Sequence, residues 1–479
     1  MRVLLAVAAL GALAACTVGP DYERPSAPQP AAGAYKEIAG FKPAAPSAPQ
    51  SGAPWWSIYD DPLLASLEGE VVVSNETLKA DEAAFRVASA IVDEARAGYY
   101  PTVTASASAA RTAAAFQGGS VTRGGGRGGS STIYQNSFSI GPAATWVPDI
   151  WGKIRRSVES DVANAQASAA DLAAAQLSEQ GTLATDYFEL RIADEQKRVL
   201  EQTIAADQRS LEIARNQFNA GFVAQTDVAT AETQLETAHA QLIGLDVQRA
   251  TLEHAVAVLI GKPPADFSIA RVSYPTTVPV VPAGVPSTLL ERRPDIAAAE
   301  RAMASENALI GVAISAYYPD ITLSADATFA SSMIQNVLSL ANAGWTAAAA
   351  ASGTVFDGGL RSAQVAAARA SYDEAVASYR NTVLAAFQQV EDDLASLRIL
   401  QQQYAAQEIA VRSSEQAVTL TVNQYQAGTV AYTAVVVAQT TALGDEQQLL
   451  NILQSRLVAS ANLIEALGGG WDAKQLPAL

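Results

Sequence analysis

Cysteine and histidine are almost missing from this 479-residue chain, which has one cysteine, Cys16, and two histidines. A disulfide framework or a thiolate metal site is therefore excluded. His239 and His254 fall in a stretch with a helical pattern, and we expect neither to bind a metal or to act in catalysis. The sequence also lacks HExxH, GxSxG and a glycine-rich loop followed by Lys-Ser/Thr. We therefore expect no enzymatic activity, no metal and no cofactor.

Positive charge and long apolar runs are also scarce. The chain has 31 Lys and Arg against 48 Asp and Glu, which gives a net charge of −17. Because nucleic acids bind through basic side chains, a nucleic-acid partner is not expected. A membrane-spanning helix needs a run of about 18 or more apolar residues, and the sequence has no such run. A helical membrane span is therefore excluded.

Proline is missing from two long tracts, 149–262 and 320–476, although the chain has 21 prolines. Because proline breaks helix interiors, both tracts favour long helices. In the second tract, apolar residues recur every three or four positions from Tyr372 to Leu397, which is the period of a helix. The predicted long helices lie at about 152–220 and 359–427, and shorter returning helices lie at about 226–260 and 433–467.

A six-residue motif occurs twice. NQFNAG ends at Gly221, and NQYQAG ends at Gly428, 207 positions later. The same offset relates five further pairs of identical residues: Asp186 and Asp393, Leu190 and Leu397, Arg191 and Arg398, Arg249 and Arg456, and Gly261 and Gly468. The chain is therefore two copies of one unit of roughly 200 residues. Glycine suits the C-terminal cap of a helix, so the motif predicts two helical hairpin tips.

Four segments ahead of the long helices alternate apolar with small or polar residues, as strands do. They are 102–116, 133–147, 321–330 and 345–356. Each has about the length of a tilted membrane strand, and the loops that join them, 117–132 and 331–343, are expected at the extracellular end. Four strands leave open edges, which lipid does not tolerate, so subunits are expected to pool their strands. A dimer would give eight strands and little lumen, whereas a trimer would give twelve.

The N-terminus has the features of a lipoprotein signal peptide. Arg2 precedes an apolar run that is too short to span a bilayer, and LAAC ends at Cys16. An ordinary secretory signal with a chance cysteine is the alternative. Thr17 occupies the place where an aspartate would typically retain a lipoprotein at the inner membrane, so outer-membrane sorting is implied. Residues 17–54 have eight prolines and no periodicity, which predicts an extended tether.

Several stretches together carry a resemblance to a known family: CTVGPDYERP (16–25), WWSIYDDPLL (55–64), LLERRPDI (289–296), YYPDITLSA (317–325), FDGGLR (356–361) and LGGGW (467–471). Over nearly its whole length the chain resembles TolC-like outer membrane factors of the lipoprotein (NodT-type) branch. The resemblance implies a homotrimer with one twelve-stranded outer-membrane β-barrel, to which each subunit gives four strands. This barrel would be continuous with a long periplasmic α-helical barrel and a mixed α/β equatorial domain.

The resemblance also implies a function. Such proteins are exit ducts of tripartite efflux pumps, and they dock on a periplasmic adaptor (membrane fusion) protein and an inner-membrane transporter. We therefore expect this chain to export small molecules across the outer membrane of a Gram-negative bacterium, anchored to outer-membrane lipid at Cys16. The alternative is a lipid-anchored coiled-coil structural or adhesin-type envelope protein, which would not explain the duplicated strand pair.

The resemblance places a gate at the hairpin tips, next to the expected adaptor-docking site. In the best-studied family members, acidic residues six or nine positions after the second tip glycine form rings at the constriction; here those positions are Ala434 and Val437. Tyr425 and Asp227 do match the family's tip tyrosine and first-repeat aspartate. Two alternatives remain open. Either the tip closes by apolar contact with hydrogen bonds from Tyr425 and Asp227 between neighbouring hairpins, or the valines at 435–437 simply pack between helices.

The expected division of the chain follows from these patterns. It comprises a signal peptide (1–15), a lipid anchor and tether (16–54), a first repeat (55–262), a crossover linker (263–288), a second repeat (289–470) and a C-terminal tail (471–479).

Overall fold

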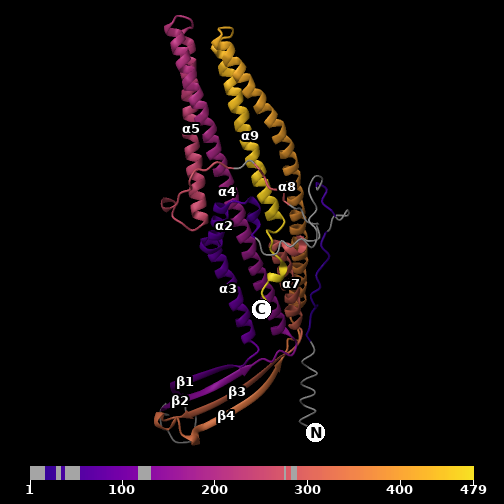
Figure 1. The fold of residues 1–479 in the computed structure, drawn as a ribbon. Coiled ribbons are helices and arrows are strands. Elements are labelled where there is room, and N and C mark those ends of the chain that lie inside the picture. Colours follow the sequence, from indigo (N-terminus) through magenta and orange to yellow (C-terminus); the bar gives the residue numbers. More distant parts are fainter. Residues whose placement is uncertain (1–16, 29–33, 38–53, 117–130, 275–276, 282–288) are drawn as a thin grey trace, which may run out of the picture.

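The computed structural model of the chain describes residues 17–28, 34–37, 54–116, 131–274, 277–281 and 289–479. The molecule is long and narrow: two helical hairpins reach one end, and a curved four-stranded sheet lies across the other (Figure 1). The expected signal peptide and Cys16 lie outside the described residues.

Two long helices form the length of the molecule. Helix α4 (Lys153–Asn219) and helix α8 (Leu360–Gln426) have 67 residues each, or roughly 100 Å at 1.5 Å per residue. Helices α5 (Gln225–Leu259) and α9 (Tyr432–Ala466) return beside them and have 35 residues each. All four helices begin and end within one residue of the bounds expected from the proline-free tracts.

A carboxylate caps the start of each long helix. Asp149 accepts hydrogen bonds from the backbone N–H groups of Ile154 and Arg155, both at 2.9 Å. Asp357 accepts one from the backbone N–H of Arg361 at 3.3 Å. The first N–H groups of a helix have no partner within the helix, so these carboxylates stabilise both points where the chain turns from strand to helix.

Two 22-residue helices were not predicted. Helix α3 (Glu76–Ala97) and helix α7 (Pro294–Ser315) each end just before a Tyr-Tyr-Pro sequence and a strand pair. Helix α3 packs on α4, and α7 packs on both α4 and α8. Each repeat therefore runs as a helix, two strands, a long helix and a returning helix. The shorter helical segments are η1 (Trp55–Tyr59), α2 (Pro62–Ser74), η2 (Pro264–Asp266), α6 (Leu289–Arg292), η4 (Ile334–Asn336), η5 (Leu340–Asn342) and η6 (Ala473–Gln475).

The two strand pairs join in one antiparallel sheet of order β1-β2-β3-β4. Its strands are β1 (Thr102–Phe116), β2 (Ser131–Trp146), β3 (Asp320–Ser331) and β4 (Ala343–Ser352). The expectation of a strand reaching residue 356 was wrong. Gly353 follows the last strand residue, and glycine weakens a strand. The next large side chains, Val355 and Phe356, are 97% and 87% exposed outside the sheet.

The register gives the sheet two different faces, because directly paired residues share a face and neighbours along a strand alternate. One face is almost wholly apolar: Val103, Ala105, Ala107, Ala109, Phe138, Ile140, Ala144, Trp146, Leu323, Ala325, Ala327, Phe329, Trp345, Ala347 and Ala349. The other carries hydroxyl, amide and carboxylate groups: Thr104, Ser106, Ser108, Thr112, Gln135, Ser137, Ser139, Thr145, Thr322, Ser324, Asp326, Thr328 and Thr346. The polar exceptions on the apolar face are Arg111, Thr132, Asn136 and Ser331, which lie toward the ends of the strands. The guanidinium of Arg111 lies 5.0 Å from the ring centre of Tyr134.

The main hydrophobic core lies midway along the molecule. There α4, between Leu183 and Ile192, packs with α2 and with the ends of α5 and α9. Among the described helices, none has the length and hydropathy needed to cross a membrane.

Candidate functional site at the hairpin tips

The two hairpin tips are closed by the same turn. Gly221 and Gly428 have φ angles of 78° and 72°, a left-handed conformation that favours glycine. The N–H of Phe222 donates to the carbonyl oxygen of Gln217 at 2.9 Å, and the N–H of Thr429 makes the matching bond in the second hairpin at 3.0 Å. These bonds satisfy carbonyl groups at the helix ends, as in a Schellman turn. Both tips lie at the end of the molecule remote from the sheet (Figure 1).

Tyr425 and Asp227 come together between the two hairpins of one chain. Tyr425 is 6% exposed, and its ring centre lies 5.3 Å from that of the buried Tyr432. Burial raises the pKa of Tyr425, and the nearby Asp227 carboxylate raises it further. The Tyr425 hydroxyl has no hydrogen-bond partner among the described residues of the chain. Within a single chain the Tyr425 hydroxyl therefore makes none of the expected hydrogen bonds between neighbouring hairpins, and that part of the gate stays a prediction.

The valines at 435–437, after the second tip, differ in their surroundings. Two alternatives were open for them: closing the tip by apolar contact, or packing between helices. Val435 is 1% exposed and belongs to a buried cluster that joins the hairpins, and Val436 packs against that cluster. Ala434 is half-buried, and Val437 is 65% exposed. Packing between helices therefore accounts for Val435, whereas Val437 points away from the chain's own core.

Asp207 is a tip-region residue that the sequence analysis missed. Its side chain is on α4, the residue is 1% exposed, and neither carboxylate oxygen has a hydrogen-bond partner in the described parts of the chain. Burial raises its pKa to about 6. Burial, and then the Asp207 carboxylate, raise the pKa of Tyr432 to about 12. A signal was present: Asp207 lies three residues after Ile204 and four before Leu211, on the apolar stripe of the helix.

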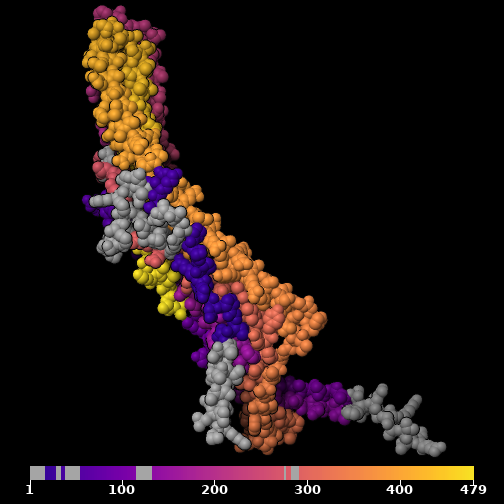
Figure 2. All heavy atoms as spheres, turned by 90° about the vertical axis from the view of Figure 1, so that its right-hand side faces the viewer, coloured from indigo at the N-terminus to yellow at the C-terminus, as the bar shows by residue number. Residues whose placement is uncertain are grey.

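The N-terminal segment 17–28 is extended, as expected, but it is docked on the body (Figure 2). The N–H of Val18 donates to the carbonyl oxygen of Trp151 at 3.2 Å. The buried guanidinium of Arg156 donates to the carbonyl oxygen of Val18 at 3.3 Å and to Asp21 at 2.8 Å. We call residues 17–28 the strap. An extended tether was the expectation for this segment; the strap is extended, but its docking on the body was not predicted.

The strap continues along the helices. The Tyr22 hydroxyl donates to Glu300 on α7 at 2.5 Å, and Arg24 donates to the Tyr379 hydroxyl on α8 at 3.1 Å. Its first residue, Thr17, contacts the turn at Gly152, between the sheet and α4. The described chain next to Cys16 therefore begins where sheet and helices meet.

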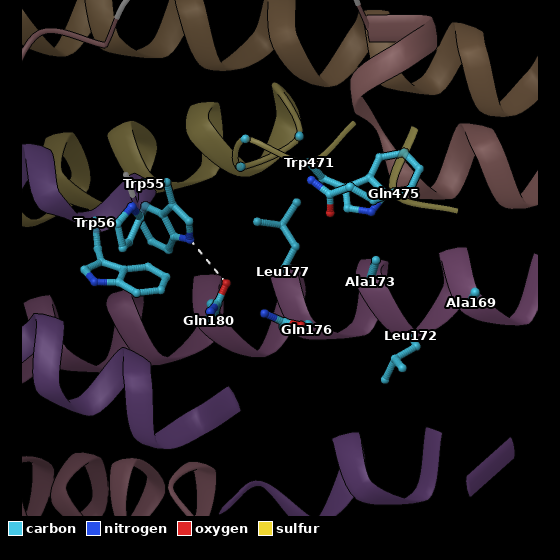
Figure 3. A pocket seen from close by; sticks show the side chains of 14 residues that line it. Trp55, Trp56, Ala169, Leu172, Ala173, Gln176, Leu177, Gln180, Trp471 and Gln475 are labelled. Carbon is cyan, nitrogen blue, oxygen red and sulfur yellow. Dashed lines mark hydrogen bonds between the residues drawn. The ribbon is translucent and has the colours of Figure 1, made fainter. Parts of the chain in front are cut away.

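An open pocket of about 510 Å³ lies midway along the molecule, between η1, α4 and the segment after α9 (Figure 3). Trp55, Trp56 and Trp471 line it, and the indole N–H of Trp55 donates to Gln180 at 3.4 Å. No charged side chain lines this pocket, so it offers ring stacking and amide hydrogen bonds rather than acid–base chemistry. Across the described residues, no group of three or more His, Cys, Asp or Glu side chains is placed to hold a metal ion.

Comparison with known proteins gives a consistent result. The family model for outer membrane efflux proteins matches residues 69–262 and 285–469. The chain is 28% identical over 472 residues to the solvent efflux pump outer membrane protein SrpC of Pseudomonas putida, and the match covers 98% of each. It is 27% identical over 477 residues to the probable outer membrane lipoprotein SilC of Salmonella typhimurium, again covering 98% of each. The solved structure of the outer-membrane channel OprN matches with a TM-score of 0.85 and 27% identity, over 95% of this chain and 100% of that one.

Proposed function

This chain belongs to the outer membrane efflux protein family, and from that premise we propose that it forms the outer-membrane exit duct of a tripartite efflux pump. The observation that carries the proposal is the two-faced sheet at one end of two long helical hairpins. An apolar face suits lipid, and a hydroxyl-rich face suits a water-filled lumen. The long helices then extend the passage into the periplasm.

The sheet edges support assembly of several copies. Strands β1 and β4 are the edges of the four-stranded sheet, and each presents unpaired backbone groups. In lipid these groups must be satisfied, and the first strand of a second copy can pair with the last strand of the first. Three copies close a twelve-stranded barrel with a lumen, and we propose a homotrimer on this ground.

The proposed role is transport, and no residue is assigned to catalysis. The tips at Gly221 and Gly428 are the proposed docking site for a periplasmic adaptor, behind which an inner-membrane transporter supplies the cargo. Phe222, next to the first tip glycine, is 82% exposed and suits such a contact. SrpC is named for solvent efflux. We propose small molecules as the cargo of this chain too, with the transporter selecting their chemistry.

We propose lipid attachment at Cys16. The LAAC sequence supports it, and so does the docked strap, which brings the described chain to the junction of sheet and helices, where the membrane surface would lie. Mass spectrometry of the mature N-terminus should find an acylated cysteine followed by Thr17. An unmodified Cys16 would refute the anchor without affecting the duct.

Planar-bilayer recording of the purified protein tests the duct, with native mass spectrometry of the same sample to count its copies. We expect discrete conductance steps from a trimer. The alternative, a lipid-anchored structural or adhesin-type protein, predicts no conductance at any copy number. A trimer that never conducts, even after mutations that loosen the tips, would refute the proposal.

A further inference from the structure

A cavity of about 230 Å³ lies between α4, α8 and α9, in the half of the molecule that carries the tips. Its apolar wall includes Val418 and Leu443. Its polar wall includes Asp207 from α4 and Gln439 from α9. The cavity thus combines an apolar surface with a few polar groups, as small-molecule sites commonly do.

Two side chains that line this cavity have acceptor oxygens without donors, three oxygen atoms in all. Both Asp207 oxygens are buried without a partner in the described chain, although the residue is only 1% exposed. The Gln439 side chain donates its N–H to Ser210 at 3.4 Å, but its buried Oε1 also has no partner there. Leaving a buried acceptor unpaired costs free energy, so these acceptors suit a ligand that brings donors.

The charges around the cavity have one sign. Glu415 and Glu446 also line it, and no lysine or arginine does. Burial raises the pKa of Glu446 and the Glu415 carboxylate raises it further, whereas Arg198, which lies outside the lining, lowers it. A cationic ligand therefore fits this field better than a neutral or anionic one.

The carboxylates do not converge as metal ligands do. No three Asp, Glu, His or Cys side chains within the described ranges are grouped closely enough to hold an ion. A compact metal ion would also leave the apolar wall without a contact. An ammonium group on a short hydrocarbon chain uses both walls, because it donates to the acceptors and packs its alkyl part against Val418 and Leu443.

We propose that this cavity is a binding site for small organic ammonium ions, with Asp207 and Gln439 as the groups that recognise the cation. The site goes beyond the duct function, because binding there requires neither a membrane nor a pump. Since its walls come from α4 in the first repeat and from α8 and α9 in the second, an occupant also ties the two hairpins together.

Isothermal titration calorimetry on the purified full-length protein tests the site, with n-butylammonium as the probe at constant ionic strength. We expect saturable binding of n-butylammonium and none of n-butanol, which has the same alkyl chain without the charge. Asp207→Asn should weaken binding by about tenfold or more, because it removes the charge that faces the ammonium group. The matched control is Glu212→Gln, which removes an exposed carboxylate from the same helix and should leave the affinity unchanged.

A second variant guards against a folding effect of the first. Gln439→Leu keeps the volume of the side chain but removes the acceptor, so it should also weaken n-butylammonium binding. Wild-type affinity in both variants, equal binding of n-butanol, or no binding to the wild type would each overturn the proposal. None of these results bears on conductance, so the proposal of this binding site and the proposal of the duct can be refuted independently.

Discussion

Glu68 on α2 is a carboxyl group buried without a partner. It is 0% exposed and lies among the apolar residues Leu64, Leu67 and Val71 of the midway core. Neither of its oxygens has a hydrogen-bond partner among the described residues. Burial alone raises its pKa from the ordinary 4.5 to about 9. The folded protein therefore keeps this group protonated at neutral pH.

The sign of the resulting pH dependence follows from proton counting. Between about pH 4.5 and 9 the folded chain holds a proton at Glu68 that the unfolded chain has released. Stability therefore falls as the pH rises through this window, by up to about 1.4 kcal/mol per pH unit from this group. Below pH 4.5 both states are protonated, and the penalty disappears.

We predict that Glu68→Gln raises the melting temperature at pH 8 and has much less effect at pH 5. Glutamine keeps the shape and removes the proton uptake. Circular dichroism melts of the purified protein at both pH values check this. Glu82→Gln, at an exposed position on α3, is the control and should change neither melt. A gain that is equal at pH 5 and pH 8 would contradict the burial argument.

At the scale of elements, the strap depends on one buried arginine. Arg156 is 3% exposed and donates to two backbone carbonyl groups of the strap and to Asp21. Asp21 is an exposed partner, and exposed ion pairs contribute little. The bonds to the carbonyl groups are shielded from water and contribute most of the stability of the docked strap.

We predict that Arg156→Ala releases the strap while the helical hairpins stay folded. Deuterium uptake within residues 17–24 should become about tenfold faster or more at Val18, because a released strap also loses the bond from the Val18 N–H to the carbonyl oxygen of Trp151. Hydrogen-exchange mass spectrometry measures it, with Lys153→Ala, an exposed position one turn earlier, as the control. Unchanged uptake at 17–24 in the Arg156 variant would mean that the other strap contacts suffice.

The elements differ in how far the sequence could predict them. The long helices and tips follow from local signals, namely the absence of proline and a glycine after each NQ[FY]xAG motif. The docking of the strap could not be read locally, since its partners, Arg156 and Glu300, are more than 130 positions away. Helices α3 and α7 were not predicted: each has only 22 residues, lies outside the proline-free tracts and leads directly into a strand pair. For the tips, the family resemblance pointed to Tyr425, but the burial of Asp207 depends on two hairpins packing together.

At the scale of the whole molecule, the two ends must face different compartments. The apolar sheet face belongs in the outer membrane, and the helices extend about 100 Å from it. The segment between β3 and β4 lies at the far edge of the sheet, and Leu338 within it is 71% exposed. This segment should therefore face the cell exterior.

We predict that Leu338→Cys is labelled in intact cells by a membrane-impermeant, PEG-linked maleimide. Phe222→Cys, at a hairpin tip, is the matched control, because it is also exposed but should lie in the periplasm. It should react only after the outer membrane has been permeabilised. Labelling in the reverse order would invert the orientation of the molecule.

The closure of the duct is the last consequence of threefold assembly. Val437 follows the second tip by nine residues and is 65% exposed in a single chain, so a threefold axis through the tips can bring three copies together. If apolar contact among them keeps the duct shut, Val437→Asp should raise the resting conductance in planar bilayers, because three carboxylates repel one another at short range. Val437→Asn, which is polar but uncharged, should raise it less.

Asp227→Ala should also loosen closure, because it removes a hydrogen-bond acceptor beside Tyr425, whose hydroxyl has no partner among the described residues. Resting conductance at the wild-type level in all three variants would place the constriction elsewhere along the helices.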